Sequence, residues 1–106
     1  MMPALKEKKR YIVFVTDLDM NQASREIKRC VHDFIGILGS ARAGVQFLDE
    51  CWDKNKGMGV VRCDNRYASE VKASLVLSEN FFSIPFTTGI IQKAKTFIKR
   101  YDGNKL

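Results

Sequence analysis

The chain has 106 residues, of which 45% are hydrophobic and 28% charged, a size and balance typical of one globular domain and not of a disordered chain. No apolar run approaches the roughly 18 residues that a membrane span needs, and the start lacks the apolar segment of a signal peptide. We therefore expect a single domain over residues 1–106, with residues 1–6 as a flexible arm, in a soluble cytoplasmic protein with no membrane partner.

The net charge of +6 is concentrated at the two ends of the chain. Residues 6–10 hold four cations and one acid, and residues 93–106 hold five cations and one acid, so the residues between them are nearly neutral. If the two ends meet in space, they form one basic patch. Such a patch suits a polyanion, with nucleic acid the leading candidate and a membrane surface the second.

Cysteine, histidine and carboxylate positions give little indication of a metal or catalytic site. The three cysteines are Cys30, Cys51 and Cys63. They show no C-x-x-C spacing, and we expect reduced, mostly buried thiols. His32 is expected on the solvated side of a helix, and Asp17 and Asp19 are interpreted as a solvated turn rather than a metal site. We predict no bound metal and no catalytic side chain, because a nuclease acting alone usually brings clustered carboxylates or a histidine pair.

The first predicted strand, residues 11–15, is apolar on both of its alternating faces. This pattern is typical of a central strand that is covered on both sides. Phe14 is accordingly expected in the core, with the final helix of the chain as a cover. The alternative is that Phe14 stacks on a base from an open sheet.

A helix is predicted after Asn21, a good N-cap, and Gly39 can end it in a left-handed conformation. Its apolar stripe consists of Ala23, Ile27, Cys30, Val31, Phe34, Ile35 and Leu38. Residues 40–44 are small and are interpreted as a flexible loop. Arg42 in this loop either reaches a phosphate or is simply solvated.

Two strands, at 45–52 and 58–63, are predicted on either side of a turn at 53–57. Gly59 would weaken a strand interior, so it marks a bulge or a close packing approach. A second helix is predicted from about residue 66 to 78, capped by Asp64 or Asn65. Three of its apolar residues, Ala73, Val76 and Leu77, fall outside its inner face. They are either covered within the monomer or contact a partner, and we favour the partner.

The fourth predicted strand, residues 81–86, contains Pro85, which lacks a ladder donor and indicates a sheet edge. The final helix is predicted over residues 87–100, with Thr87 or Thr88 as its cap. Its apolar side consists of Ile90, Ile91, Ala94, Phe97 and Ile98, and its polar side of Gln92, Lys93, Lys95, Lys99 and Arg100.

The predicted order is β-α-β-β-α-β-α. Its first six elements form a ferredoxin-like, RNA-recognition-motif-like split β-α-β arrangement, an α/β (α+β) sandwich with a four-stranded antiparallel sheet and two helices on one face. The extra C-terminal helix has only the other face or an edge of that sheet on which to bury its apolar side.

Four stretches together resemble a known family. They are residues 7–12 (EKKRYI), 59–63 (GVVRC), 71–75 (VKASL) and 88–95 (TGIIQKAK). Their order and spacing resemble protein component 2 of archaeal ribonuclease P, whose relatives also serve the eukaryotic enzyme. The family commonly has Ser-Gly-Thr-Ile where this chain has residues 88–91.

The resemblance implies a protein subunit of ribonuclease P, the enzyme that removes the 5′ leader from precursor tRNA. It implies that the RNA subunit carries the active site and binds the Mg²⁺ ions, so that the protein has no cofactor and no catalytic side chain. It also implies that the chain supports the catalytic RNA, meets precursor tRNA through the holoenzyme, and pairs with protein component 3 as a two-plus-two heterotetramer.

Residue chemistry then gives the expected contacts. The residues expected to bind RNA are Lys8, Lys9, Arg10, Arg42, Lys93, Lys95, Lys99 and Arg100. The residues expected at the protein interface are Ala73, Val76 and Leu77. Two alternatives stay open. One is a stand-alone single-strand RNA binder with an open sheet, and the other is a small-molecule regulatory domain of the same fold.

Overall fold

The computed structural model describes residues 9–78 and 82–101. The strands are β1 (Lys9–Thr16), β2 (Gln46–Phe47), β3 (Met58–Asp64) and β4 (Phe82–Thr88). The helices are α1 (Met20–Ala43), α2 (Ala68–Val76) and α3 (Ile91–Arg100), with short 3-10 helices η1 (Asp49–Cys51) and η2 (Asn65–Tyr67) between strands and helices.

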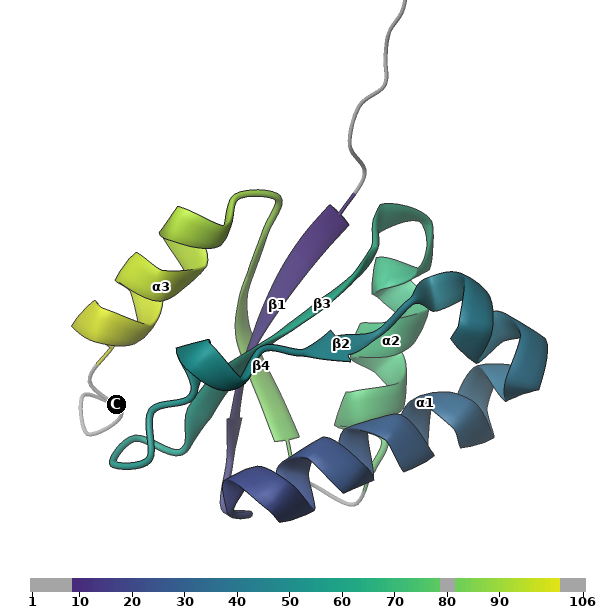
Figure 1. Ribbon diagram of the computed structural model, residues 1–106, viewed down its shortest axis with the longest axis horizontal. Coiled ribbons are helices and arrows are strands. Elements are labelled where there is room, and N and C mark those ends of the chain that lie inside the picture. The colour runs from purple at the N-terminus through teal and green to yellow at the C-terminus, as the bar shows by residue number, and fades with distance from the viewer. Residues whose placement is uncertain (1–8, 79–81, 102–106) are drawn as a thin grey trace, which may run out of the picture.

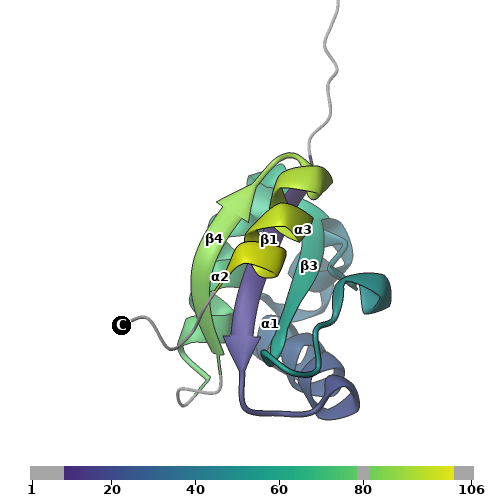
Figure 2. The same ribbon diagram turned by 90° about the vertical axis from the view of Figure 1, so that its left-hand side faces the viewer.

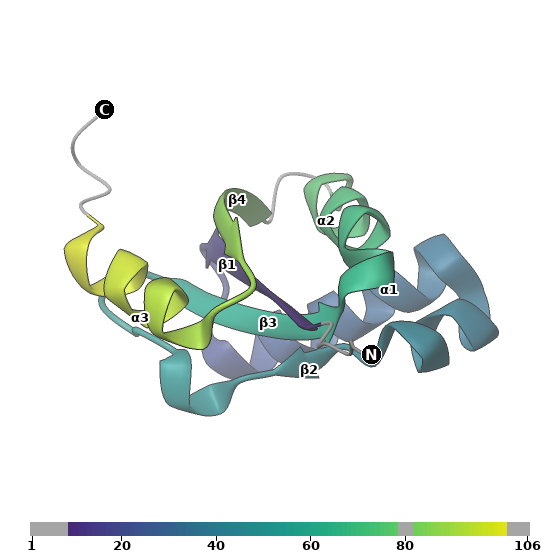
Figure 3. The same ribbon diagram turned by 90° about the horizontal axis from the view of Figure 1, so that it is seen from above.

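The four strands form one sheet in the order β2-β3-β1-β4, with every neighbouring pair antiparallel. Helices α1 and α2 cover one face of the sheet and α3 covers the other (Figures 1 and 3). This arrangement confirms the ferredoxin-like α+β fold with an added C-terminal helix, and it places that helix across the central strand β1 (Figure 2).

Strand β1 separates two hydrophobic clusters. Ile12 and Phe14 point into the cluster beneath α1 and α2, whereas Val13 belongs to the cluster beneath α3. Phe14 is fully buried, and its ring centroid lies 5.6–6.2 Å from those of three other aromatic residues. Phe14 is therefore a core residue, as favoured, but α1 and α2 bury it rather than the final helix, and it offers no surface to a base.

The predicted boundaries of α1 were wrong at both ends. The cap is Asp19 rather than Asn21, because its carboxylate accepts the backbone N–H of Gln22 at 2.8 Å in a capping box. Gly36, at φ 79°, breaks the helical conformation, and the chain resumes helix as far as Gly44, whose φ of 58° ends it. Gly39 does not end the helix, and Arg42 lies in its last turn and not in a loop.

The break at Gly36 changes what α1 buries. In Figure 1 the helix runs along the sheet and then turns back toward β2. Of the predicted apolar stripe, Ile35 still packs against the core cluster, but Phe34 is 47% exposed. Leu38 is 71% exposed because the part of the helix after Gly36 no longer follows the core.

The predicted second strand was too long. Only Gln46 and Phe47 pair with β3, after which η1 carries the chain away from the ladder. The turn after it returns the chain to β3. There Gly59 marks a close approach, since a β-carbon built on it would lie 2.8 Å from Phe14 Cζ and 2.9 Å from Trp52 Cε3.

The last three elements are present as expected, but their bounds differ: α2 ends at Val76 rather than residue 78, and β4 continues to Thr88 rather than ending at residue 86. Asp64 caps η2 by accepting the backbone N–H of Arg66 at 2.8 Å, and α2 itself begins only at Ala68. Strand β4 is an edge strand, as Pro85 indicated, although residue 81 lies outside the described residues. Helix α3 begins at Ile91 with no side-chain cap. The Thr88 hydroxyl accepts the Ile90 N–H ahead of the helix, and Ile90 is 50% exposed instead of buried.

Candidate nucleic-acid interface

Helix α3 is fixed on the sheet by a small apolar seam. Ala94 and Ile98 are buried against the cluster that contains Val13 and Val60. Phe97 stacks on Phe86 of β4, with ring centroids 4.7 Å apart and planes within 4° of parallel. The seam uses one side of the helix, so the remaining side carries polar and charged residues into solvent.

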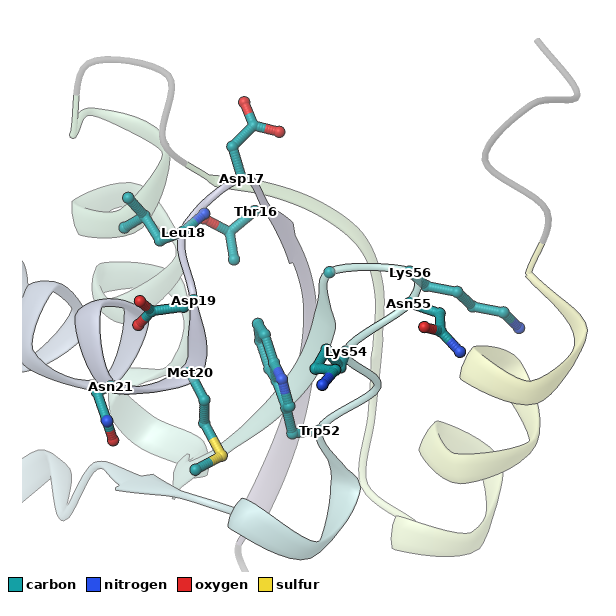
Figure 4. A pocket seen from close by; sticks show the side chains of 11 residues that line it. Thr16, Asp17, Leu18, Asp19, Met20, Asn21, Trp52, Lys54, Asn55 and Lys56 are labelled. Carbon is teal, nitrogen blue, oxygen red and sulfur yellow. The ribbon is translucent and has the colours of Figure 1, made fainter.

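Lys56, in the turn before β3, holds the far end of α3. Its Nζ donates to the carbonyl oxygens of Ile98 at 2.5 Å and Lys99 at 3.0 Å. A cation at this position complements the partial negative charge at a helix C-terminus and satisfies carbonyls that have no partner within the helix. Figure 4 shows the Lys56 side chain extended toward the last turn of α3. Sequence reasoning missed this residue.

The basic start of β1 meets the start of α3. Tyr11 is paired with Thr88, so the residues before Tyr11 lie beside the β4–α3 connection. There a β-carbon built on Gly89 would lie 2.7 Å from Arg10 Nη1, which places the Arg10 guanidinium against that turn. Lys9 is exposed at the same end, and Lys8 lies outside the described residues. The basic start of β1 therefore lies beside the start of α3, whose first turn carries Lys93.

The four cations of α3 are exposed and divide into two flanks. Lys93 and Arg100 line a groove shared with Phe86 of β4, whereas the charge of Lys95 acts on Cys51 of η1 on the other side of the helix. Lys99 is four residues from Lys95 and so shares its flank. Together with the start of β1, these residues form a basic stripe along α3 instead of one compact patch. The basic stripe consists of Lys9, Arg10, Lys93, Lys95, Lys99 and Arg100.

Arg42 lies apart from this stripe. It is exposed on the last turn of α1, which packs on the opposite face of the sheet from α3. An RNA backbone that runs straight along α3 therefore does not contact Arg42.

The outer surface of α2 carries the three residues expected at a protein interface. Ala73 is half-buried, while Val76 and Leu77 are exposed by 52% and 69%. Leu77 lines a groove of 280 Å³ with Phe34 of α1, and Ala73 and Val76 line another, of 500 Å³, with residues of β4. The fold does not bury these side chains within the monomer, contrary to the first of the two interpretations of the sequence.

Sequence reasoning missed a second exposed apolar group, on α1. Phe34, Ile37 and Leu38 are exposed by 47%, 72% and 71%. For Ile37 and Leu38, Gly36 was the signal that could have shown this, because a glycine between apolar residues can adopt the positive φ that turns the following part of the helix away from its core. The exposed apolar residues of α1 and α2 meet where Phe34 and Leu77 share a groove.

All three cysteines are buried free thiols, as expected. Burial raises the pKa of each, and raises that of Cys63 to about 11. A thiol is a weak nucleophile until it ionises, so these residues are inert packing groups near neutral pH. His32 is exposed, as expected.

A cavity of 660 Å³ lies at the end of β1 (Figure 4). Asp17 and Asp19 line it together with Trp52 and Lys54, and Figure 4 shows the two carboxylates pointing in different directions. The Asp19 carboxylate already caps α1. Among the described residues, no group of three or more His, Cys, Asp or Glu side chains is placed to hold a metal ion. Within the same residues, no helix is long and apolar enough to cross a membrane.

Comparison with known proteins identifies the family. The model of the Rpp14/Pop5 family matches residues 5–99. The chain belongs to the Rpp14/Pop5 family. The match confirms the family expected from the four sequence stretches, and it runs from before β1 to the last turn of α3.

Similar members of the Rpp14/Pop5 family carry the name ribonuclease P protein component 2. The protein from Pyrococcus abyssi is 31% identical over 83 residues, which cover 74% of this chain and 69% of that protein. The one from Thermococcus kodakarensis is 30% identical over 110 alignment positions, covering 93% and 90%. The one from Methanocaldococcus jannaschii is 30% identical over 105, covering 88% and 74%.

Proposed function

We propose that the chain is a protein subunit of ribonuclease P, the endoribonuclease that removes the 5′ leader from precursor tRNA. The observation that carries the proposal is the family match over residues 5–99. It is supported by relatives named ribonuclease P protein component 2, which align with this chain over most of their length. The fold is consistent with it, because the matched region contains the outer surface of α2 and all of the basic stripe except Arg100.

In this proposal the chain acts on RNA through charge. The basic stripe neutralises phosphates of the ribonuclease P RNA. The protein thereby stabilises the RNA fold that positions the substrate and the metal ions. The RNA subunit binds the Mg²⁺ ions and carries out the cleavage. By reducing phosphate repulsion, the protein lowers the Mg²⁺ concentration that the RNA requires.

The outer surface of α2 is the proposed contact site for a protein partner. Val76 and Leu77 are exposed apolar side chains at the end of a short helix, and Leu77 shares a groove with the exposed Phe34 of α1. Contiguous exposed apolar groups mark protein interaction sites. We assign them to contact with protein component 3, in a heterotetramer with two copies of each chain.

Reconstitution of the enzyme tests the function. Ribonuclease P RNA is assembled with protein component 3, with and without this chain, and cleavage of precursor tRNA is followed at low Mg²⁺. We expect cleavage to increase when the chain is added. No gain with component 3 present contradicts the assignment.

Salt dependence tests the mode of binding separately. If phosphate contacts dominate, the affinity of the chain for the RNA falls steeply as salt rises, with a slope set by the number of phosphates neutralised. An affinity that does not change between low and moderate salt contradicts the role of the basic stripe.

The open-sheet alternative loses its structural basis. It requires aromatic side chains exposed on a sheet face, whereas Phe14 is fully buried under α1 and α2, and α3 covers the opposite face. Single strands must therefore bind elsewhere on this chain.

A further inference from the structure

The α3–β4 groove lies where the flank of α3 that carries Lys93 and Arg100 passes the edge strand. It has a volume of 360 Å³, within the range of small ligand sites. The groove is lined by Phe86, Gln92, Lys93, Thr96, Phe97 and Arg100. Figure 2 shows α3 alongside β4 on the face of the sheet that α1 and α2 leave open.

Aromatic rings form the apolar wall of the α3–β4 groove. Phe86 and Phe97 are stacked with centroids 4.7 Å apart, and both are half-buried, so part of the pair remains accessible. Phe97 also meets Tyr101, with centroids 5.5 Å apart. Phe86 and Phe97 both line the groove, so a further flat ring can pack against the accessible part of the pair.

Cations flank these rings. Lys93 and Arg100 are exposed, and they are seven residues apart on α3, which is about 10.5 Å along a helix axis. Gln92 and Thr96 also line the groove and offer donors and acceptors. Among the described residues, no carboxylate lines the groove, so the charge of these lining residues favours an anionic ligand over an apolar or basic protein segment.

We propose that the α3–β4 groove binds an unpaired base of RNA, stacked on the Phe86–Phe97 pair with neighbouring phosphates on Lys93 and Arg100. Aromatic rings combined with flanking cations are the means by which proteins bind single strands without reading their sequence. The inference rests on the proposed RNA-binding function and adds to it. A row of cations alone binds any polyanion, whereas the groove selects RNA whose bases are free to stack.

Binding of the full-length chain to a short single-stranded oligoadenylate with one 2-aminopurine tests the proposal. An abasic oligonucleotide of the same length supplies the phosphates without the bases. Phe86→Leu removes the ring but keeps an apolar side chain, and Phe34→Leu, an exposed aromatic on α1, is the matched control.

We expect Phe86→Leu to weaken binding of the intact oligonucleotide by about fivefold or more, the effect of losing one stacked base, and to abolish quenching of 2-aminopurine. Binding of the abasic oligonucleotide should not change, and Phe34→Leu should bind both as the wild type does. Thermal melting will show whether Phe86→Leu unfolds the chain, and if it does, two other variants test the proposal. Phe86→Tyr, which retains the ring, must preserve quenching of 2-aminopurine. The double variant Lys93→Gln with Arg100→Gln must reduce this quenching.

Three other outcomes separate the inference from the proposed function. If the wild type binds intact and abasic oligonucleotides equally, the groove takes no base, although the basic stripe still binds phosphates. If the wild type binds neither, RNA binding itself fails. If Phe86→Leu weakens only the complex with protein component 3, the groove is a protein contact and the inference is overturned.

Discussion

Gly59 is the residue at which the sheet leaves no room for a side chain. A β-carbon there would meet the rings of Phe14 and Trp52 at 2.8 and 2.9 Å, and both rings are held in the core. We expect Gly59→Ala to lower the free energy of unfolding by about 1–3 kcal/mol, the usual cost of overpacking, as measured by urea denaturation.

Gly89→Ala is the matched control for this substitution. Its β-carbon would meet Arg10 Nη1 at 2.7 Å, but that atom is the end of a flexible, partly exposed side chain and can move aside. Gly89→Ala should therefore lower the free energy of unfolding much less than Gly59→Ala does. Equal losses at both positions would mean that glycine's backbone freedom, not close packing, explains Gly59.

Cys63 predicts how stability changes with pH. Burial raises the pKa of the folded thiol from 9.0 to about 11. Between these two pH values, the folded state keeps a proton that the unfolded state releases. Stability from this residue is therefore complete below pH 9 and is lost as the pH rises toward 11. Urea unfolding across that window should show a steeper decline for the wild type than for Cys63→Ala. Parallel declines would refute the assignment.

Single residues differed in how well the sequence could predict their role. The role of Gly59 was predictable because a glycine inside a strand is a local anomaly. The role of Lys56 was not, because its partners are backbone carbonyls 42 and 43 residues away, which no local pattern reveals. The cap of α1 lay between these cases, since Asp19 and Asn21 are both good caps and only Asp19 has Gln22 three residues on to complete a capping box.

Helix α3 can be tested as a charged element. Lys95 and Lys99 are exposed on its outer side, away from the apolar seam. We expect Lys95→Glu with Lys99→Glu to leave the fold intact, to weaken RNA binding, and to reduce the magnitude of the salt slope by roughly two, one for each lost phosphate contact. Filter binding at several salt concentrations measures both effects.

Charge reversal on another helix is the control for α3. Arg25 and Lys28 are exposed on α1, on the opposite face of the sheet, and Arg25→Glu with Lys28→Glu changes the net charge equally. If both double variants lose RNA affinity to the same extent, net charge and not the position of the basic stripe controls binding.

Helix α2 can be tested as an apolar element. Val76→Asp and Leu77→Asp should change the stability of the free chain little, since both side chains are exposed. Each should weaken binding of protein component 3 by about tenfold or more, as expected when a charge enters an apolar contact, and calorimetry measures it. Ile90→Asp, at an equally exposed apolar site before α3, is the control and should bind component 3 normally.

At the scale of elements, prediction worked where hydrophobic periodicity was continuous. The central part of α1, β3 and the inner side of α3 were predicted in this way. It failed at β2, where apolar residues from 45 to 52 suggested one strand, but the chain leaves the ladder after Phe47 and sends Cys51 into the cluster beneath α3. A strand and a 3-10 turn can bury the same residues, so the pattern alone could not distinguish them.

For the whole molecule, the decisive sequence signal was a strand apolar on both faces. Val13 and Phe14 point in opposite directions and both are fully buried, which a sheet covered on one side only could not achieve. The third layer was therefore predictable, but the path of α3 across it was not. That path depends on Phe86, Phe97 and Lys56, which come from three separate segments, and it determines where the cations of the basic stripe lie.

The break at Gly36 divides α1 into two parts that should open independently. Residues 37–43 bury only Ala43, whereas residues 23–31 carry the core contacts of the helix. We expect amide hydrogens of residues 37–43 to exchange with solvent through local opening, orders of magnitude faster than those of 23–31, as measured by mass spectrometry. Equal exchange in the two parts would show that the helix opens as one unit. Slower exchange of the amide hydrogens of residues 37–43 after a partner binds would show that this segment, which opens locally in the free chain, becomes ordered in the assembly.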